Sequence, residues 1–222
     1  MNYDWELLAA GVHRCRLPFL DVTVGLVCGS AGVLLIDCGT TLIEADGIAE
    51  DVRELTGGAV THIVLTHHHF DHILGSGGFH GAQLYAAPPV ADALTAGTAE
   101  VRREALSYGA PSAEVDRAIA SLRAPERVVT WARIDLGDRV IAIEHPGSGH
   151  TDHDRTVVFC GDLIEESADP AIGPDSEVAA WPATLDRLLA AGGSGAIYVP
   201  GHGAVVDADF VVRQRDWLAN HL

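Results

Sequence analysis

The chain has 222 residues, enough for one sizeable α/β domain with a hydrophobic core, and 48% of them are hydrophobic. Acidic residues outnumber basic ones by 31 to 14, and the resulting formal charge of −17 argues against binding to nucleic acid or anionic membranes. No apolar run approaches the ~20 residues of a membrane-spanning helix. Every basic residue is arginine, which excludes a Schiff-base lysine or a lysine that holds a substrate carboxylate.

The N-terminus and the cysteines bear on the cellular compartment. Residues 1–6 are acidic and lack the positive segment and apolar core of a signal peptide, so we expect none. The four cysteines are scattered, and three of them lie in apolar strand-like runs, which is typical of buried reduced thiols rather than disulfides or metal ligands. We therefore expect a cytoplasmic protein.

Strand and helix patterns alternate along the chain. β-branched and apolar runs predict strands, and apolar residues at helical spacing predict amphipathic helices. Gly57 and Gly58 end the first helix, and Pro182 begins a later one. The predicted elements in chain order are strands over 11–19, 22–29 and 32–36, a helix over 41–56, strands over 60–65, 82–87, 140–144 and 156–160, a helix near 182, a strand over 196–199 and a helix over 207–218.

Residues 88–124 differ in character from what surrounds them. The stretch is rich in Ala, Glu and Arg, and its apolar residues recur at helical spacing. It predicts two or three short helices, broken near Gly97 and near 109–111. These helices would either cover the sheet in the ordinary way or form a cap over the active site.

The densest group of chemically active residues is the segment 66–72, Thr-His-His-His-Phe-Asp-His. It follows the predicted strand over 60–65, where open α/β sheets place their chemistry. Imidazole and carboxylate donors together suit zinc, and also iron or manganese. Residues two apart in an extended segment point the same way, so His67 and His69 can converge on one ion, with His68 pointing away. Asp71 and His72 lie past a bend and can face a second ion.

This segment resembles the metallo-β-lactamase superfamily, and its extension to Gly75 is most similar to the glyoxalase II-type hydrolases. The resemblance is carried by several fragments in the expected order. They are residues 33–39 (Val-Leu-Leu-Ile-Asp-Cys-Gly), the histidine segment, Gly149-His150-Thr151, Gly161-Asp162-Leu163 and Pro200-Gly201-His202-Gly203.

The resemblance implies an α/β fold, a four-layer αββα sandwich of two mixed sheets, formed by a single domain over residues 1–222. It also implies two divalent metal ions, zinc first and iron or manganese as alternatives. The implied ligands are His67, His69 and His150 for one ion, Asp71, His72 and His202 for the other, and Asp162 as the bridge. It selects His150 over His145, which we expect at a strand end or pocket wall.

The implied activity is hydrolysis, in which a metal-bound hydroxide attacks the carbonyl of an ester, thioester or lactone. Asp71 would be the catalytic carboxylate, orienting that hydroxide and handling its proton. Asp37, at the end of a predicted strand, either caps a turn or orients a metal-bound histidine, as the resemblance favours. The expected partner is a small acyl substrate.

Departures from the family narrow the substrate. Asp162 disfavours β-lactamases that use a cysteine ligand, and a chain that ends soon after Gly203 leads us to expect no glutathione-binding helical domain. The main alternative is a mononuclear iron persulfide dioxygenase of the same fold. A β-lactamase, a phosphodiesterase and a non-catalytic metal-binding module are less favoured.

Overall fold

The structure is a computed structural model that describes residues 1–144, 157–174 and 176–220. The chain folds into two compact units, Met1–Ile143 and Glu144–Leu222. The expectation of a single domain over the whole chain stays a prediction. His145 and His150 lie outside the described residues.

The first unit is built on a mixed seven-stranded sheet whose strand order follows the sequence. Neighbours from β1 to β4 are antiparallel, and neighbours from β4 to β7 are parallel. The strands are β1 (Glu6–Ala9), β2 (Val12–Arg16), β3 (Thr23–Cys28), β4 (Val33–Ile36), β5 (His62–Val64), β6 (Gln83–Ala86) and β7 (Arg127–Val128). The strands predicted within residues 11–36, 60–65 and 82–87 are confirmed, whereas β1 was not predicted.

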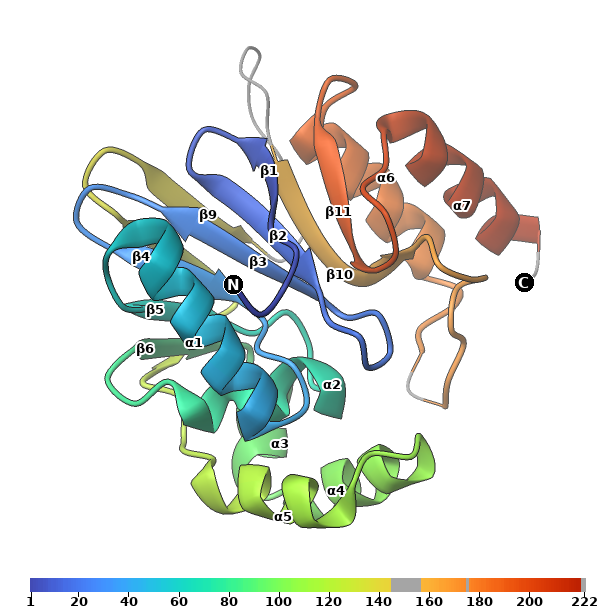
Figure 1. Cartoon of the computed structure of the whole chain (residues 1–222). Coiled ribbons are helices and arrows are strands. Elements are labelled where there is room, and N and C mark those ends of the chain that lie inside the picture. Colours follow the sequence, from blue (N-terminus) through green and yellow to red (C-terminus); the bar gives the residue numbers. More distant parts are fainter. Residues whose placement is uncertain (145–156, 175, 221–222) are drawn as a thin grey trace. The chain divides into compact units, whose positions relative to one another are not determined.

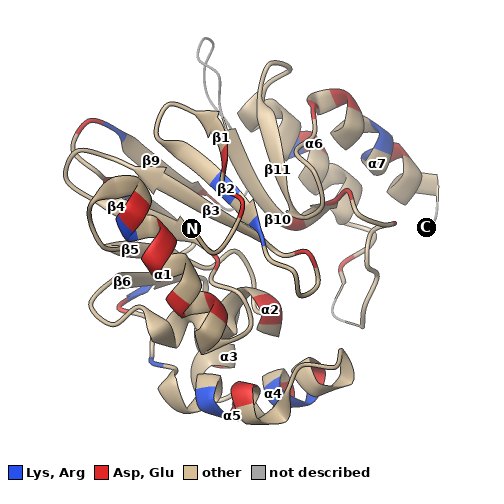
Figure 2. Cartoon of the chain, viewed as in Figure 1, with Lys and Arg blue, Asp and Glu red and all other residues tan. Residues whose placement is uncertain are grey.

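Helix α1 (Leu42–Thr56) packs on this sheet (Figure 1). The side chain of Thr41 accepts a hydrogen bond from the backbone N–H of Glu44, whose carboxylate accepts one from Thr41 N–H. This capping box fixes the start of the helix. Ile48 and Val52 are fully buried in the hydrophobic core formed with the strands. The opposite face of α1 is charged, as the acidic positions along it show (Figure 2).

A short helical segment follows β5, and three further helices follow β6. The first comprises α2 (Phe70–Ile73) and the 3-10 helix η1 (Leu74–Gly78). The others are α3 (Pro88–Thr95), α4 (Thr98–Ser107) and α5 (Ser112–Ser121), separated at Gly97 and at residues 108–111. The helices predicted over 88–124 and their breaks are therefore confirmed. Their role as a cap over the active site stays a prediction.

A hairpin of β8 (Trp131–Asp135) and β9 (Val140–Glu144) forms a separate two-stranded sheet. Arg139 lies in the turn between them, and its guanidinium donates a hydrogen bond to the carbonyl oxygen of Ala10 at 2.7 Å. The two strands are joined by a turn over residues 136–139.

The second unit contains the parallel strands β10 (Val157–Glu165) and β11 (Ile197–His202), with helices α6 (Trp181–Gly192) and α7 (Ala208–Asn220). Apolar residues of both helices and both strands form its hydrophobic core. The sequence predicted that β10 ends at Cys160, which is wrong. Gly161 adopts a φ of 54°, and the register shifts there, so a β-bulge lets the strand continue to Glu165. Among the described residues, no helix is long and apolar enough to span a membrane.

Candidate metal centre

The ends of the parallel strands β4 and β5 bring Asp37 and Thr66 together. Asp37 follows β4 in a left-handed backbone conformation with a φ of 59°, which aspartate tolerates better than most residues. Its Oδ1 accepts a hydrogen bond from Thr66 N–H at 2.9 Å, and its Oδ2 accepts one from Thr66 Oγ1–H at 2.7 Å. The buried Asp37 carboxylate therefore holds the start of the histidine segment in place.

His72 lies on α2 and is completely buried. Its Nδ1 is 2.8 Å from Asp37 Oδ2, so Nδ1 carries a proton and donates it to the carboxylate. The lone pair is then on Nε2, which is 3.7 Å from Asp71 Oδ2. A carboxylate that fixes the tautomer in this way is the usual support for a metal-binding histidine.

His67 is held by the same network through Thr66. Its Nδ1 is 3.0 Å from Thr66 Oγ1, which uses its own proton on Asp37 and so accepts from the imidazole. The Nε2 atom of His67 is left with its lone pair, 3.1 Å from Nδ1 of His69. The rings of His67 and His72 are 4.2 Å apart between centroids, so three histidines gather at one place.

This arrangement fits a metal ion. Two nitrogens 3.1 Å apart can share one ion at the usual zinc–nitrogen distance of about 2.0–2.1 Å. Thiolate ligands do not belong to the arrangement: the four cysteines are free, and burial raises the pKa of Cys38, Cys15 and Cys160, which keeps these thiols protonated. Nitrogen and oxygen donors alone are typical of zinc, iron or manganese sites.

The second unit contains candidate ligands of its own. His202 Nε2 is 3.5 Å from Asp162 Oδ2, and one ligand atom each from Asp162, Glu165 and His202 lie within 4.8 Å of one another. Gly201 is required here, because a Cβ atom at this position would lie 1.9 Å from Asp162 Oδ1. The bulge in β10 and the glycine in β11 thus allow the carboxylate and the imidazole to approach.

Glu165 was not predicted from the sequence. Its buried carboxylate accepts a hydrogen bond from Ser167 Oγ at 2.7 Å, and its backbone N–H donates to Gln214 Oε1 at 3.0 Å. Gln214 also donates to the carbonyl oxygen of Leu163, which fixes this end of β10 on α7. In the sequence, Glu165 directly follows the apolar pair Leu163-Ile164. Because the strand was predicted to end at Cys160, Glu165 was assigned to a loop.

The structure thus places the predicted residues in two groups. One group in the first unit contains His67, His69, Asp71 and His72 with Asp37, and one in the second unit contains Asp162 and His202. His68 lies beside His69, with 5.0 Å between ring centroids. The assignment of each residue to a particular ion, and the role of His150, remain predictions.

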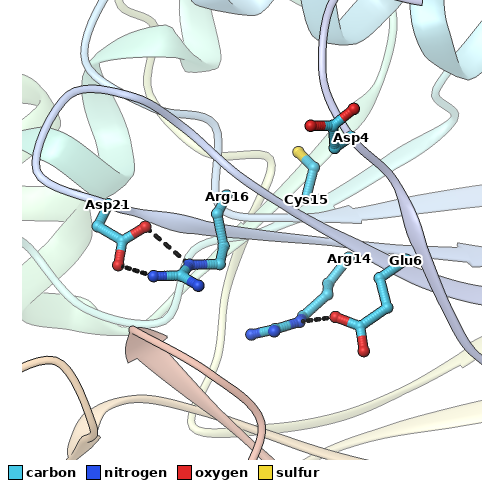
Figure 3. Close-up of a pocket in the computed structure, with 6 residues that line it drawn as sticks. All are labelled: Asp4, Glu6, Arg14, Cys15, Arg16 and Asp21. Carbon is cyan, nitrogen blue, oxygen red and sulfur yellow. Dashed lines mark hydrogen bonds and ion pairs between the residues drawn. The ribbon is translucent and has the colours of Figure 1, made fainter.

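One cavity of the first unit lies along β1 and β2 (Figure 3). Arg14 pairs with Glu6 at 2.8 Å, and Arg16 pairs with Asp21. Figure 3 shows these pairs with Cys15 and Asp4 beside them. No described member of the candidate metal centre lines this cavity, so the chemistry is not assigned to it.

Comparison with known proteins gives a consistent result. The family model of the metallo-beta-lactamase superfamily matches residues 17–202. A metallo-beta-lactamase from Pontibacter korlensis has a TM-score of 0.69 and 18% identity, covering 98% of this chain and 99% of that chain. FIM-1 from Pseudomonas aeruginosa, in a mono-zinc form, has the same TM-score and identity, covering 99% and 96%. A metallo-beta-lactamase from Hirschia baltica has a TM-score of 0.68 and 16% identity, covering 97% of each. No curated protein sequence matches.

Proposed function

Because the chain belongs to the metallo-β-lactamase superfamily, whose α/β fold it shares, we propose that it hydrolyses small esters, thioesters or lactones with two divalent metal ions. The family and fold predicted from the sequence are confirmed, and the chain is a metal-dependent hydrolase of this superfamily. We propose the finer features, which are two metal ions, a glyoxalase II-like subtype and a small acyl substrate. Zinc is the first candidate, with iron or manganese as alternatives.

One observation carries the proposal most strongly. His67 Nε2 and His69 Nδ1 lie 3.1 Å apart, close enough to bind one ion, while Nδ1 of His67 and Nδ1 of His72 are engaged by Thr66 and Asp37. A histidine-rich surface loop without a metal would have no need for a buried carboxylate that sets tautomers. We propose His67, His69 and His150 for one ion, Asp71, His72 and His202 for the other, and Asp162 between them.

When bound, two such ions polarise a carbonyl oxygen and lower the pKa of a water molecule toward about 7. The residues of the chain supply what remains. Asp71 is buried beside His72, with a carboxylate able to hold the proton released from water and return it to the leaving group. Asp37 and Thr66 keep the imidazoles oriented, so little reorganisation is needed during the reaction.

The charge of the chain supports a substrate that is neutral or only weakly charged. There is no lysine to bind a carboxylate, and Glu165 adds a second acidic side chain beside Asp162. With a formal charge of −17, the protein repels anionic substrates. For the same reason we propose no nucleic-acid or membrane partner. We propose the cytoplasm as its location, which the four free cysteines support.

The test is a substrate panel with purified full-length protein. Esters, thioesters, lactones, β-lactams, phosphodiesters and a persulfide are assayed before chelation, after chelation and after added Zn²⁺, Mn²⁺ or Fe²⁺. We expect hydrolysis of at least one acyl class, lost on chelation and restored by metal. Cleavage of phosphodiesters alone, or oxygen consumption with a persulfide and one bound iron, would place the chain in another branch of the superfamily.

A further inference from the structure

Each of the two imidazoles held by the Asp37 network has an acceptor on the nitrogen that faces away from the proposed metal. His72 has Asp37 at 2.8 Å, and His67 has Thr66 at 3.0 Å. His69 directs Nδ1 toward His67, so its outer nitrogen is Nε2. Metal-binding histidines almost always donate this second N–H to a carboxylate, a carbonyl or water. His69 should therefore have a comparable acceptor.

The residue that faces His69 in this way comes from the helices over 88–124. Glu104 Oε1 lies 4.0 Å from His69 Nε2, and both side chains are about one-third exposed, at 30% and 33%. This separation is longer than a hydrogen bond, so the carboxylate must approach by about 1 Å to accept the N–H of His69. Glu104 is on α4, which belongs to the same unit as the histidine segment.

A second contact ties the same face of α4 to the same loop. Tyr108, one helical turn after Glu104, lies against Phe70, the residue next to His69, with 5.6 Å between ring centroids. Residues four apart project from the same side of a helix. The two arginines of α4 pair elsewhere on this helical layer, Arg102 with Asp116 of α5 and Arg103 with Glu100. Glu104 of α4 and Tyr108, the residue that caps its C-terminus, thus lie against two consecutive residues of the histidine segment.

We propose that Glu104 is a positioning residue for His69, and that α4 thereby sets how tightly the chain holds its metal. The carboxylate accepts the Nε2–H of His69 and keeps Nδ1 available for the ion. Asp37 acts in the same way on His72, where it accepts Nδ1–H and leaves Nε2 for the ion. The segment predicted as a cap would then support the metal centre directly. This inference rests on the proposed role of His69 as a ligand.

The experiment compares zinc affinity in matched variants of the full-length protein, by competition with a chromophoric chelator. Glu104→Ala should weaken the affinity for the ion bound by His69 by about tenfold. This is the lower end of the usual effect of removing a hydrogen-bond partner of a metal ligand, because Glu104 is partly exposed. Glu104→Gln should recover most of the loss, since its amide oxygen still accepts a hydrogen bond. The visible spectrum of the cobalt-substituted protein should change in Glu104→Ala.

Glu100→Ala is the control, because Glu100 is on the same helix, is 71% exposed and carries the same charge. It should leave affinity within twofold of the wild type. The melting temperature of metal-free Glu104→Ala should match that of the metal-free wild type, which separates positioning from helix packing. Equal losses in Glu100→Ala and Glu104→Ala, or unchanged affinity in Glu104→Ala, would overturn the inference. A wild-type protein that binds no metal would instead overturn the proposed function.

Discussion

Replacing His67 or His69 with alanine should lower hydrolytic activity by roughly 10³-fold and remove at least one metal ion. Each variant loses one of the two nitrogens that lie 3.1 Å apart. A bound ion contributes several kcal/mol to transition-state stabilisation, and each 1.36 kcal/mol corresponds to a factor of ten in rate. The measurements are metal content by elemental analysis and kcat/KM with the substrate identified in the panel.

His68→Ala is the matched control for this pair, because it removes an imidazole from the same loop. We expect it to retain both ions, since the hydrogen-bond network that orients the site runs through Thr66, His67 and His72. A His68→Ala variant that loses metal while His67→Ala retains it would show that the ligand register is displaced by one residue.

Asp51→Ala should destabilise the protein by about 3 kcal/mol. Asp51 is fully buried on α1, and its carboxylate accepts hydrogen bonds from the backbone N–H groups of Asn2 and Tyr3 and from the indole N–H of Trp5. Hydrogen bonds to a charged group contribute about 1.5–3 kcal/mol each to stability. In the variant, the N–H groups of the N-terminal residues can bond to water instead, which offsets part of the lost stability. For a chain of this size the melting temperature should fall by roughly 6–12 °C.

Asp46→Ala makes the same substitution on an exposed position of the same helix. It should change the free energy of unfolding by less than about 0.5 kcal/mol, as exposed substitutions usually do. Thermal unfolding of the metal-free proteins provides the comparison. If Asp51→Ala and Asp46→Ala unfold at the same temperature, the N-terminal segment is not held through Asp51.

The parts of the fold that the sequence predicted are those set by local patterns. The helical spacing of apolar residues over 41–56 and the glycines that follow predicted α1 without reference to the rest of the chain. The histidine segment was recognisable because its ligands lie within a few residues of one another. The buried, β-branched strands β3 and β4 follow from composition alone.

The features that were missed depend on contacts between distant segments. Strand β10 extends past Cys160 because Gly161 forms a bulge and Gln214 of α7 binds its far end. Glu165 and Glu104 are ordinary acidic residues in the sequence, and only the folded chain brings them beside His202 and His69. Likewise, Asp37 could have been a turn cap or a support for a histidine, and its distance of 2.8 Å from His72 gives a physical basis for the second role.

The central proposal is a two-metal hydrolase, and a zinc titration of the metal-free chain tests it most directly. Zinc bound per chain and acyl hydrolysis are measured at each addition. The proposal predicts that binding saturates at two ions per chain and that activity reaches its maximum as the second ion binds. Saturation at one ion, even with excess Zn²⁺, Mn²⁺ or Fe²⁺, or acyl hydrolysis that persists in the metal-free protein, would contradict it.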